Sequence, residues 1–411
     1  MIQPKQNNRL IILILGTLAT VSPFSIDMYL PAFSQIASDF HTETAQIALS
    51  VSSYFIGMAI GQILYGPLLD RFGRKRPLYI GLSIFILASI GCTQSSSIET
   101  LTVLRFIQAL GGSVAWVGSV AMVRDFFPVE ESAKIFSLLV LILGVSPLLA
   151  PTFGGFITVS LGWQWVFIML AGITLLILLV TIFYLPEGNA PDKTISLKAG
   201  PMIETFASVL KHPQFYTYAF SGAFSFATLF IYVAGSPVIF MEVYHVTPQV
   251  YGGIFAMLSV GFIGGSQLNI FLNRKFKSEQ LFRFALIVQV INSIVFLAFA
   301  WNNWLGLYPT LVFLFIALSC IGIINPNATA LALAPFTRNV GSASALIGCL
   351  QIGVAALASS GVGLSHSTET LPIIGLFSGT AIVALVILMI GRKTIGSQLA
   401  EATITPENVS H

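Results

Sequence analysis

The strongest constraint in this sequence is a series of apolar runs, each about twenty residues long, separated by short polar segments. A run of that length crosses a bilayer as an α-helix, whereas the strands of a membrane β-barrel alternate apolar and polar residues. Only 9% of the residues are charged and 55% are hydrophobic, which is too little charge to cover a soluble surface. We therefore predict an all-α polytopic membrane protein with twelve transmembrane helices. The predicted spans are 9–36, 44–68, 77–94, 100–124, 132–159, 163–185, 214–241, 247–272, 279–300, 304–332, 340–364 and 371–391.

The first run could instead be interpreted as a secretory signal peptide. It is too long for one, continues through Asp27 and Pro31, and contains no clear small-residue cleavage site. We therefore interpret this run as the first transmembrane span.

The distribution of basic residues predicts the orientation of the chain. Of the 19 Lys and Arg residues, all except Arg105 lie near the chain ends or in every second connection between spans. The intervening connections carry His41, Glu43, Glu99, Glu242 and Glu369 instead. Because cytoplasmic loops carry the excess of Lys and Arg, we expect a multi-pass protein of the inner membrane with both termini in the cytoplasm. The net charge of +3 thus reflects orientation, and we expect no nucleic-acid partner.

The longest polar interruption divides the chain into two halves of six spans. We predict an N-terminal bundle over 1–186, a cytoplasmic linker over 187–213, a C-terminal bundle over 214–393 and a disordered tail over 394–411. Within the linker, Ser196–Leu210 fits a short amphipathic helix, and a flexible linker is an equally good interpretation. Two six-helix repeats predict pseudo-symmetric bundles around a central cavity, which is the arrangement of secondary transporters.

Two charged residues fall inside predicted spans, Asp27 and Arg105. A charge at the centre of a bilayer costs at least about 2.5–3.5 kcal/mol, so its default interpretation is functional. At the helical rise, Asp27 lies about 27 Å from the cytoplasmic edge at Arg9, and Arg105 lies about 9 Å from the outer edge at Glu99. Both therefore belong to the outer half of the bilayer, and we predict that they form a proton-coupling pair. A permanent structural ion pair is the alternative interpretation.

The predicted pair suggests that a proton and a substrate compete for Asp27. A nearby cation favours the charged carboxylate, whereas burial disfavours it. A carboxylate held between these two influences can gain and lose a proton as its exposure alternates. We therefore expect protons and a small molecule as the partners of this chain in the lipid bilayer.

The segment between the second and third spans carries a second motif, Gly66-x-x-x-Asp70-Arg71-x-Gly73-Arg74-Lys75-Arg76. A basic stop-transfer loop would explain the cations but neither the acid nor the glycines. Glycine permits a tight turn, and a carboxylate among cations forms strong charge-assisted hydrogen bonds. We therefore predict a conformational lock at this loop.

This loop resembles the loop 2–3 signature of the major facilitator superfamily. The resemblance extends to Arg105–Gly112, which is similar to the family's helix 4 motif, and to Gly144–Gly155, which is similar to the helix 5 motif of exporting antiporters. The segment Ser22–Pro31 is similar to the Bcr/CflA group of drug efflux proteins. The resemblance implies a drug:proton antiporter that works by alternating access.

The same resemblance implies further roles for individual residues. In the lock, Asp70 would brace the start of the eleventh span, near Gly341-Ser342, and the basic end of the fourth span at Arg124. The helix 5 motif comprises Gly144, Pro147, Pro151, Gly154 and Gly155. Proline kinks a helix and glycine allows close approach, so this helix could pack tightly against its counterpart in the other half. For the glycines elsewhere we favour ordinary helix packing: these are Gly57, Gly61, Gly252, Gly261, Gly264 and Gly265.

Candidates for substrate contact combine an apolar setting with a polar group, as small-molecule sites usually do. Besides Asp27 and Arg105, they are Tyr29, Tyr54, Gln108, Trp116, Tyr232, Asn325 and Gln351. Interhelical hydrogen bonding is the alternative role for each. The three cysteines, Cys92, Cys320 and Cys349, form no metal-ligand or disulfide pattern, and we expect neither a metal nor any other cofactor.

The favoured function is proton-coupled efflux of drugs or antibiotics, meaning small molecules like bicyclomycin or chloramphenicol. The alternative is proton-coupled export of a physiological metabolite, such as a siderophore or an amino-acid derivative. A membrane-embedded enzyme would need clustered His, Glu or Cys residues, and a channel would need a ring of charges, so we expect neither. The absence of a G-x-x-x-x-G-K-[ST] segment argues against direct use of ATP, and we expect a monomer.

Overall fold

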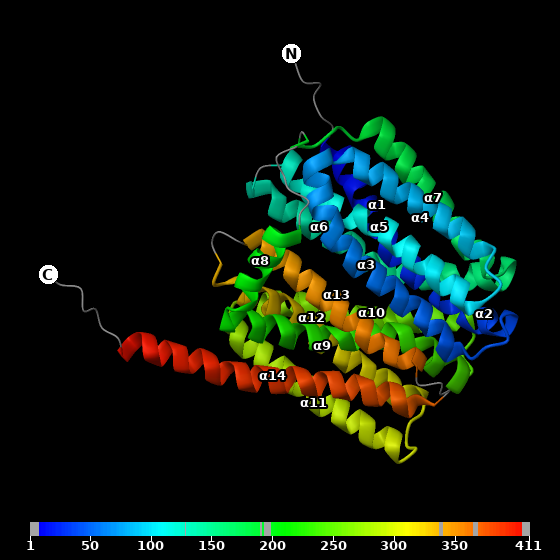
Figure 1. Ribbon diagram of the computed structural model, residues 1–411. Helices are drawn as coiled ribbons and strands as arrows, with labels where there is room; N and C mark the ends of the chain where they lie inside the picture. Colours follow the sequence, from blue (N-terminus) through cyan, green and yellow to red (C-terminus); the bar gives the residue numbers. More distant parts are fainter. Residues whose placement is uncertain are drawn as a thin grey trace. The chain divides into compact units, whose positions relative to one another are not determined.

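The computed structural model describes residues 8–127, 129–189, 191–192, 199–336, 340–364 and 369–404. Every regular element formed by these residues is a helix (Figure 1). Eleven helices in the described ranges are long and apolar enough to cross a membrane. The remaining helix of comparable length is α6, in which Ser146–Leu161 is the apolar part with described side chains. The expected helical class and number of spans are therefore confirmed.

The helix boundaries follow the predicted spans closely. The elements are α1 Asn8–Asp27, η1 Leu30–Ala32, α2 Phe33–Asp39, α3 Thr44–Phe72, α4 Lys75–Thr93, α5 Ile98–Phe126, α6 Val129–Leu161, α7 Gln164–Tyr184, α8 Ala199–Leu210, α9 Pro213–Pro237, η2 Val238–Val243, α10 Pro248–Leu272, α11 Ser278–Trp301, α12 Leu307–Leu333, α13 Val340–Leu364 and α14 Thr370–Ile404.

Four segments refine the predicted spans and connections. The first span is divided into α1, the short 3₁₀ helix η1 and α2, and the break directly follows Asp27. The seventh span ends in a π-helix, η2. The linker contains α8, so the helical interpretation of that segment holds. Helix α14 continues to Ile404, so part of the segment expected to be a disordered tail is helical, and the rest of it lies outside the described residues.

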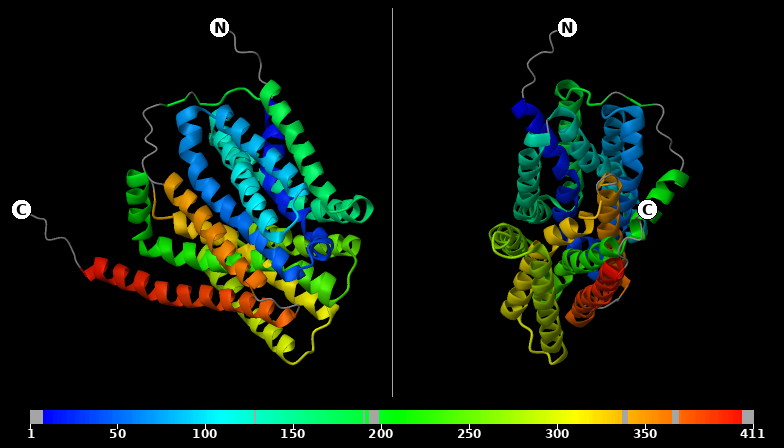
Figure 2. Two further views of the ribbon diagram at one scale, coloured as in Figure 1. Left: turned by 45° about the vertical axis from the view of Figure 1, so that its right-hand side comes forward. Right: turned by 90° about the vertical axis from the view of Figure 1, so that its left-hand side faces the viewer.

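The helices form two compact units. The first comprises Met1–Leu197 together with Tyr232–Val260 and Ser359–Ile373, and the second comprises the remaining segments. In the first unit, α5 packs between α3 and α4, α7 packs on α4, and α1 contacts α5, α6 and α7 (Figures 1 and 2). This packing surrounds the ends of α1 and α5 that carry Asp27 and Arg105.

Two later segments join the first unit through hydrogen bonds and close backbone contacts. Ser34 and Thr44 donate to the same oxygen of Glu242 in η2, at 2.9 Å and 2.8 Å. Ser52 of α3 bonds the hydroxyl of Ser359 in α13 at 3.0 Å. These bonds tie α2 and the start of α3 to η2, and α3 to α13.

The second unit has its own apolar core. Aromatic and aliphatic side chains of α9, α11, α12, α13 and α14 are buried together, among them Phe215, Phe282, Ile324, Leu346 and Leu388. A polar connection runs beside this core. Ser225 donates to Gln289 at 2.6 Å, and Gln289 donates to Thr228 at 3.3 Å. Since buried polar groups need partners, this network links α9 to α11 inside the second unit.

Most of the glycines expected to serve packing do so. A Cβ on Gly57 would lie 2.5 Å from the carbonyl oxygen of Phe106, and one on Gly61 would clash with Ser113, so α3 approaches α5 closely there. In the second unit, Gly265 of α10 lies against the backbone of Ser319 in α12. Gly264 is different, because a Cβ there would meet nothing within 4 Å.

Gly264 and Gly265 provide a matched test of this packing. We expect Gly265→Ala to destabilise the protein by about 1–3 kcal/mol, because the methyl group would overlap the backbone of α12. We expect Gly264→Ala to be neutral or to stabilise by up to about 1 kcal/mol, because alanine favours the helix and meets no neighbour. Melting temperatures of the two variants in the same detergent test this, and equal effects would contradict the described contact of α10 with α12.

Candidate functional site

Asp27 is the last residue of α1 and lies at the break in the first span. It is only 7% exposed. The chain turns through Met28 and Tyr29 before η1 begins, and Pro31 lies within η1. The backbone of Met28 packs against Gly154 of α6, where any side chain would clash. Irregular backbone at membrane depth is tolerated where protein surrounds it, so the close approach of α6 allows the break that presents Asp27.

The surroundings of Asp27 are polar but contain no cation among the described residues. Ser146 of α6 lies within reach of the Asp27 carboxyl, although its hydroxyl makes no hydrogen bond of standard geometry. Asp27 also interacts electrostatically with Tyr232 and Tyr251. The hydroxyl of Tyr251 bonds Ser236 at 2.7 Å, whereas the buried hydroxyl of Tyr232 has no partner. Asp27 therefore faces hydroxyl groups that could accept or supply a hydrogen bond when its protonation changes.

Arg105 of α5 is fully buried in the same unit. Its NH1 group donates to Ser25 Oγ at 2.8 Å and to Gln108 Oε1 at 2.5 Å, and its NH2 group donates to the Ser25 carbonyl at 3.1 Å. Gln108 in turn donates to Ser89 of α4 at 2.6 Å. Neutral oxygen atoms thus hold the guanidinium, and Nε has no hydrogen-bond partner.

The expected ion pair between Asp27 and Arg105 is not formed in this structure. Ion pairs in the described part of the chain include those of Arg74 with Asp70, Arg74 with Asp125 and Arg392 with Glu279, and none of these involves Asp27 or Arg105. Counting residues along helices placed both charges at a similar depth, but depth does not determine which way a side chain points. Successive helical residues differ by about 100° in direction, and Ser25, two residues before Asp27, is the one that faces Arg105.

Three of the predicted substrate contacts surround Arg105. The guanidinium carbon lies 4.6 Å from the ring centre of Tyr29 and 4.3 Å from that of Tyr54, and Gln108 accepts one of its hydrogen bonds. Tyr29 also bonds Ser50 through its hydroxyl at 2.8 Å. The three side chains are buried, so in this structure they contact Arg105 in the protein interior.

The other predicted contacts lie apart from Arg105. Tyr232 is near Asp27, and its ring stacks on Phe255 with centres 5.3 Å apart. Trp116 is half-buried on α5. Gln351 donates to Asn325 at 2.7 Å within the second unit, where both side chains are half-buried. Asn325 and Gln351 thus form the interhelical hydrogen bond that was their alternative role, and a role in substrate contact stays a prediction.

The loop between α3 and α4 forms ion pairs, as the lock motif predicts. Gly73 has a φ angle of 83°, a backbone conformation that favours glycine. The turn brings Arg74 to Asp70 at 2.5 Å and to Asp125 at 2.7 Å. The side chains of Arg74 and Asp125 are almost fully buried, whereas that of Asp70 is 48% exposed. Arg74 is therefore the centre of this cluster, and Asp125 is its buried partner.

The details of the lock differ from those implied by the resemblance. Arg124 is exposed at the end of α5, and the adjacent residue, Asp125, faces the loop. Neighbouring helix residues point in different directions, and a role for Arg124 in the lock stays a prediction. Arg71 lies over the ring of Phe72, and Gly66 has open space where a Cβ would lie. The side chains of Gly341-Ser342 lie outside the described residues.

Glu187 completes the cluster. Its carboxylate accepts hydrogen bonds from the backbone N–H groups of Arg74 and Lys75, at 2.7 Å and 3.0 Å. Burial alone would lower the pKa of Arg74, but the carboxylates of Asp125 and Asp70 raise it above its ordinary value. Sequence reasoning missed Asp125 and Glu187, although Asp125 directly follows a residue of the implied lock. The arrangement keeps Arg74 charged and fixes the start of α4.

The prolines and glycines of the helix 5 motif lie on α6. Pro147 and Pro151 are inside the helix. A Cβ on Gly155 would lie 2.6 Å from the carbonyl oxygen of Pro248, and one on Gly252 would lie 2.8 Å from the Cα of Thr152. The helix therefore packs closely on the start of α10 within the first unit. The side chain position of Gly144 lies outside the described residues.

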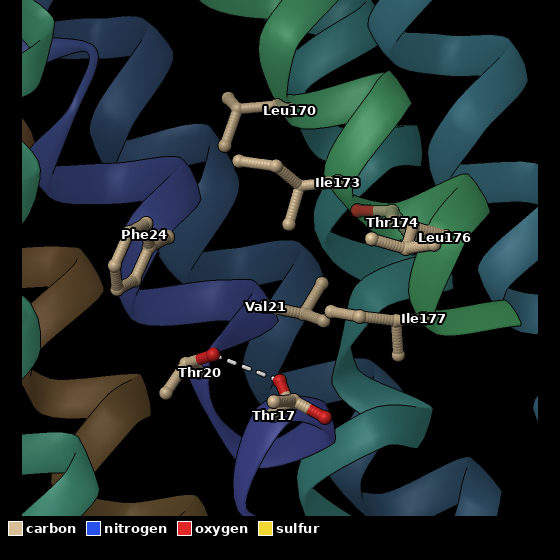
Figure 3. A pocket seen from close by; sticks show the side chains of 9 residues that line it. All are labelled: Thr17, Thr20, Val21, Phe24, Leu170, Ile173, Thr174, Leu176 and Ile177. Atoms are coloured by element: carbon tan, nitrogen blue, oxygen red, sulfur yellow. Dashed lines mark hydrogen bonds between the residues drawn. The ribbon is translucent and has the colours of Figure 1, made fainter. Parts of the chain in front are cut away.

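A separate apolar pocket lies between α1 and α7 (Figure 3). Its volume is about 200 Å³. The hydroxyl of Thr20 donates to the backbone carbonyl of Thr17 (Figure 3). That of Thr17 donates to the carbonyl of Ile14, so both hydroxyls offer little to a ligand. None of the predicted substrate contacts lines this pocket. Its lining consists of Thr17, Thr20, Val21, Phe24, Leu170, Ile173, Thr174, Leu176 and Ile177.

Among the residues that the structure describes, no group of three or more His, Cys, Asp or Glu side chains is arranged so that it could hold a metal ion. The three cysteines are free thiols, and Cys92 and Cys320 are buried. Apart from the Arg74–Asp125 pair, the chemistry that the described residues support is therefore that of the buried acid Asp27, the buried base Arg105 and the hydroxyl and aromatic groups around them.

Comparison with known proteins identifies transporters of similar sequence and fold. The family model of the Major Facilitator Superfamily matches residues 15–360. The uncharacterized MFS-type transporter YdgK of Bacillus subtilis is 35% identical over 358 residues, covering 86% of this chain and 89% of that protein. The bicyclomycin resistance protein homolog of Haemophilus influenzae is 31% identical, covering 92% and 94%. The multidrug resistance protein MdtL of Klebsiella pneumoniae is 29% identical, covering 91% and 93%.

The solved structures that resemble this chain support the same fold. A D-xylose-proton symporter superimposes with a TM-score of 0.73 at 15% identity, covering 93% of this chain and 97% of that one. A bacterial homologue of the lysosomal transporter Spinster superimposes with a TM-score of 0.71 at 16% identity, covering 95% and 96%. At such identities, the similarity concerns the fold alone.

The cluster at Arg74 leads to a test with a matched control on adjacent residues. We expect Asp125→Ala to destabilise the protein by about 3 kcal/mol, because it removes one partner of a buried ion pair. Arg124→Ala is expected to change stability by less than about 0.5 kcal/mol, because this side chain is exposed. Thermal unfolding of both variants in one detergent provides the measurement, and a larger loss in Arg124→Ala would show that the assignment of partners is wrong.

Proposed function

Because the chain belongs to the Major Facilitator Superfamily, we propose that it exports small drug-like molecules, such as bicyclomycin or chloramphenicol, in exchange for protons. The proposal rests above all on Asp27, a buried carboxylate at the break in the first span. The names of two relatives support the choice of substrate, since one is a bicyclomycin resistance protein homolog and another a multidrug resistance protein. The chain acts as a monomer in the inner membrane.

Protons and substrate compete for Asp27 in the proposed mechanism. When the site opens outward, Asp27 takes up a proton and its hold on the substrate weakens. When the site opens inward, Asp27 releases the proton and binds the next substrate from the cytosol or the inner leaflet. A buried carboxylate suits this exchange because burial disfavours its charged form, and a change of exposure reverses that effect.

The hydroxyl groups near Asp27 support the same mechanism. Tyr232 is buried and its hydroxyl lacks a partner, and Ser146 lies close to the carboxyl. An unpartnered buried hydroxyl is costly, about 1–3 kcal/mol. A change of protonation at Asp27, or a polar group of the substrate, would remove that cost by giving Tyr232 a partner.

Arg105 serves the site as a fixed positive charge in this proposal. Its Nε is the one guanidinium nitrogen that makes no hydrogen bond, and its N–H suits a carbonyl or other oxygen of a substrate. Tyr29, Tyr54 and Gln108 line its surroundings. Arg105 therefore contributes to substrate binding together with Asp27, without being its ion-pair partner in the described state.

Alternating access requires contacts that form and break at the two ends of the spans. The cluster of Asp70, Arg74 and Asp125 provides such a contact on the side of the basic loops. The bias of Lys and Arg supports a cytoplasmic position for these loops and for both termini. On the opposite side, Ser34 and Thr44 bind Glu242.

The central test replaces the acid without changing its size. Expressed in a pump-deficient, drug-sensitive bacterial host, the wild-type chain should raise resistance to some members of a compound panel. We expect Asp27→Asn to abolish this resistance and to reduce substrate-induced proton movement in inverted vesicles at least about tenfold, because the amide cannot take up a proton. Membrane abundance should be unchanged.

The matched control is Glu43→Gln, since Glu43 is an exposed acid that directly precedes α3. It should keep both resistance and proton movement. Proton-driven efflux that persists in Asp27→Asn would contradict the proposal. Absence of resistance to every compound with the wild-type chain would instead favour export of a metabolite.

A further inference from the structure

The hydrogen-bond partners of the buried Arg105 guanidinium are neutral, so its charge needs further stabilising contacts. A buried charge normally needs an ion partner and hydrogen bonds. The hydrogen bonds of Arg105 reach Ser25 and Gln108, both uncharged. Its other electrostatic neighbours are Tyr29, Tyr54 and the thiol of Cys92. The ion pairs among the described residues do not include Arg105.

Aromatic rings surround the guanidinium on several sides. The guanidinium carbon lies 4.3 Å from the ring centre of Tyr54 on α3, 4.6 Å from that of Tyr29 at the break after α1, and 5.8 Å from that of Phe167 on α7. Each distance is within the range of cation–π attraction, which strengthens when water is excluded. Three separate segments therefore contribute one ring each to an aromatic cage, which we define as Tyr29, Tyr54 and Phe167.

The ring of Phe167 is held in place from the end of α2. The ring centres of Phe167 and Tyr29 lie 5.4 Å apart, and those of Phe167 and Trp163 lie 6.1 Å apart in a perpendicular arrangement. Trp163 is buried and donates from Nε1 to Asp39 at 2.7 Å. Phe40 packs edge-on against Trp163 at 5.6 Å. Phe167 is thus braced by a contact chain that reaches the carboxylate of Asp39.

We propose that Phe167 is a positioning residue that, as part of the aromatic cage, holds Arg105 away from Asp27 and so lets Asp27 exchange protons independently of Arg105. The inference rests on the proposed proton exchange at Asp27. Aromatic rings stabilise a cation without accepting hydrogen bonds from its N–H groups, as a carboxylate would. The guanidinium of Arg105 therefore stays charged without an ion pair to Asp27. The groups that face Asp27 are Ser146, Tyr232 and Tyr251.

Loss of one ring should have a specific electrostatic result. Without Phe167, the guanidinium is less strongly held and can move toward the nearest carboxylate. An opposite charge within about 4–6 Å favours the charged form of a carboxylate by about 1–3 pH units. Asp27 would then remain ionised at a more acidic pH than in the wild type. If Phe167 had a purely structural role, its loss would lower the stability of the protein but would not change the pH at which Asp27 is protonated.

The experiment follows protonation of Asp27 directly and needs no substrate. Infrared difference spectra of the purified, reconstituted protein are recorded as a function of pH, and the carboxylic acid band of Asp27 is identified by its loss in Asp27→Asn. We expect the half-point of this band to fall by at least about one pH unit in Phe167→Leu. Phe167→Tyr keeps the ring and should titrate like the wild type.

A second pair of variants allows the same test if Phe167→Leu does not fold. Tyr54→Leu removes another ring of the cage and should lower the half-point, whereas Tyr54→Phe keeps the ring and should not. The proposal is overturned if a folded leucine variant titrates like the aromatic variant at the same position, or if the half-point of the leucine variant rises. Because the spectra do not depend on transport, failure here is distinguishable from failure of the proposed efflux, which drug resistance and proton movement test.

Discussion

The structure depends on burying one acid and one base in the membrane-spanning part of the chain without joining them. A lone charge in hydrocarbon is costly, and a salt bridge would be the simplest way to reduce that cost. Here Arg105 is stabilised by rings and neutral oxygens, and Asp27 lies among hydroxyl groups. In the mechanism that we propose, the charge of Asp27 therefore changes while that of Arg105 stays constant. An acid whose charge can change alone is what a proton-coupled transporter requires.

The fold serves this separation through close helix contacts. Gly154 lets α6 approach the backbone at Met28, and the break that follows Asp27 lies at this contact. Glycines on α3 and α10 bring α5 and α12 to equally short distances. At the loop between α3 and α4, the positive φ of Gly73 turns the chain so that Arg74 reaches Asp125. Small residues at a few positions thus determine where the charged residues lie.

The sequence predicted the helices and the burial of the key charges well, because both follow from the cost of exposing polar groups to lipid. It predicted poorly which side chains these charged residues contact. Arg124 and Asp125 are adjacent, and hydropathy cannot tell which of them faces the loop. Asp27 was assigned to Arg105 because depth can be counted along a helix, whereas side-chain direction at a helix break cannot. Phe167 is one of 33 Phe residues, and no local pattern distinguishes the one that contacts a guanidinium.

A double-mutant cycle on stability tests the separation of the two charges most directly. The unfolding free energies of the wild type, Asp27→Asn, Arg105→Gln and the double variant would be compared in one detergent. Our account predicts nearly additive effects, with a coupling below about 0.5 kcal/mol, as expected for groups that do not interact directly. A coupling of about 1–3 kcal/mol, typical of residues in contact, would show that Asp27 and Arg105 are an ion pair and would contradict the account.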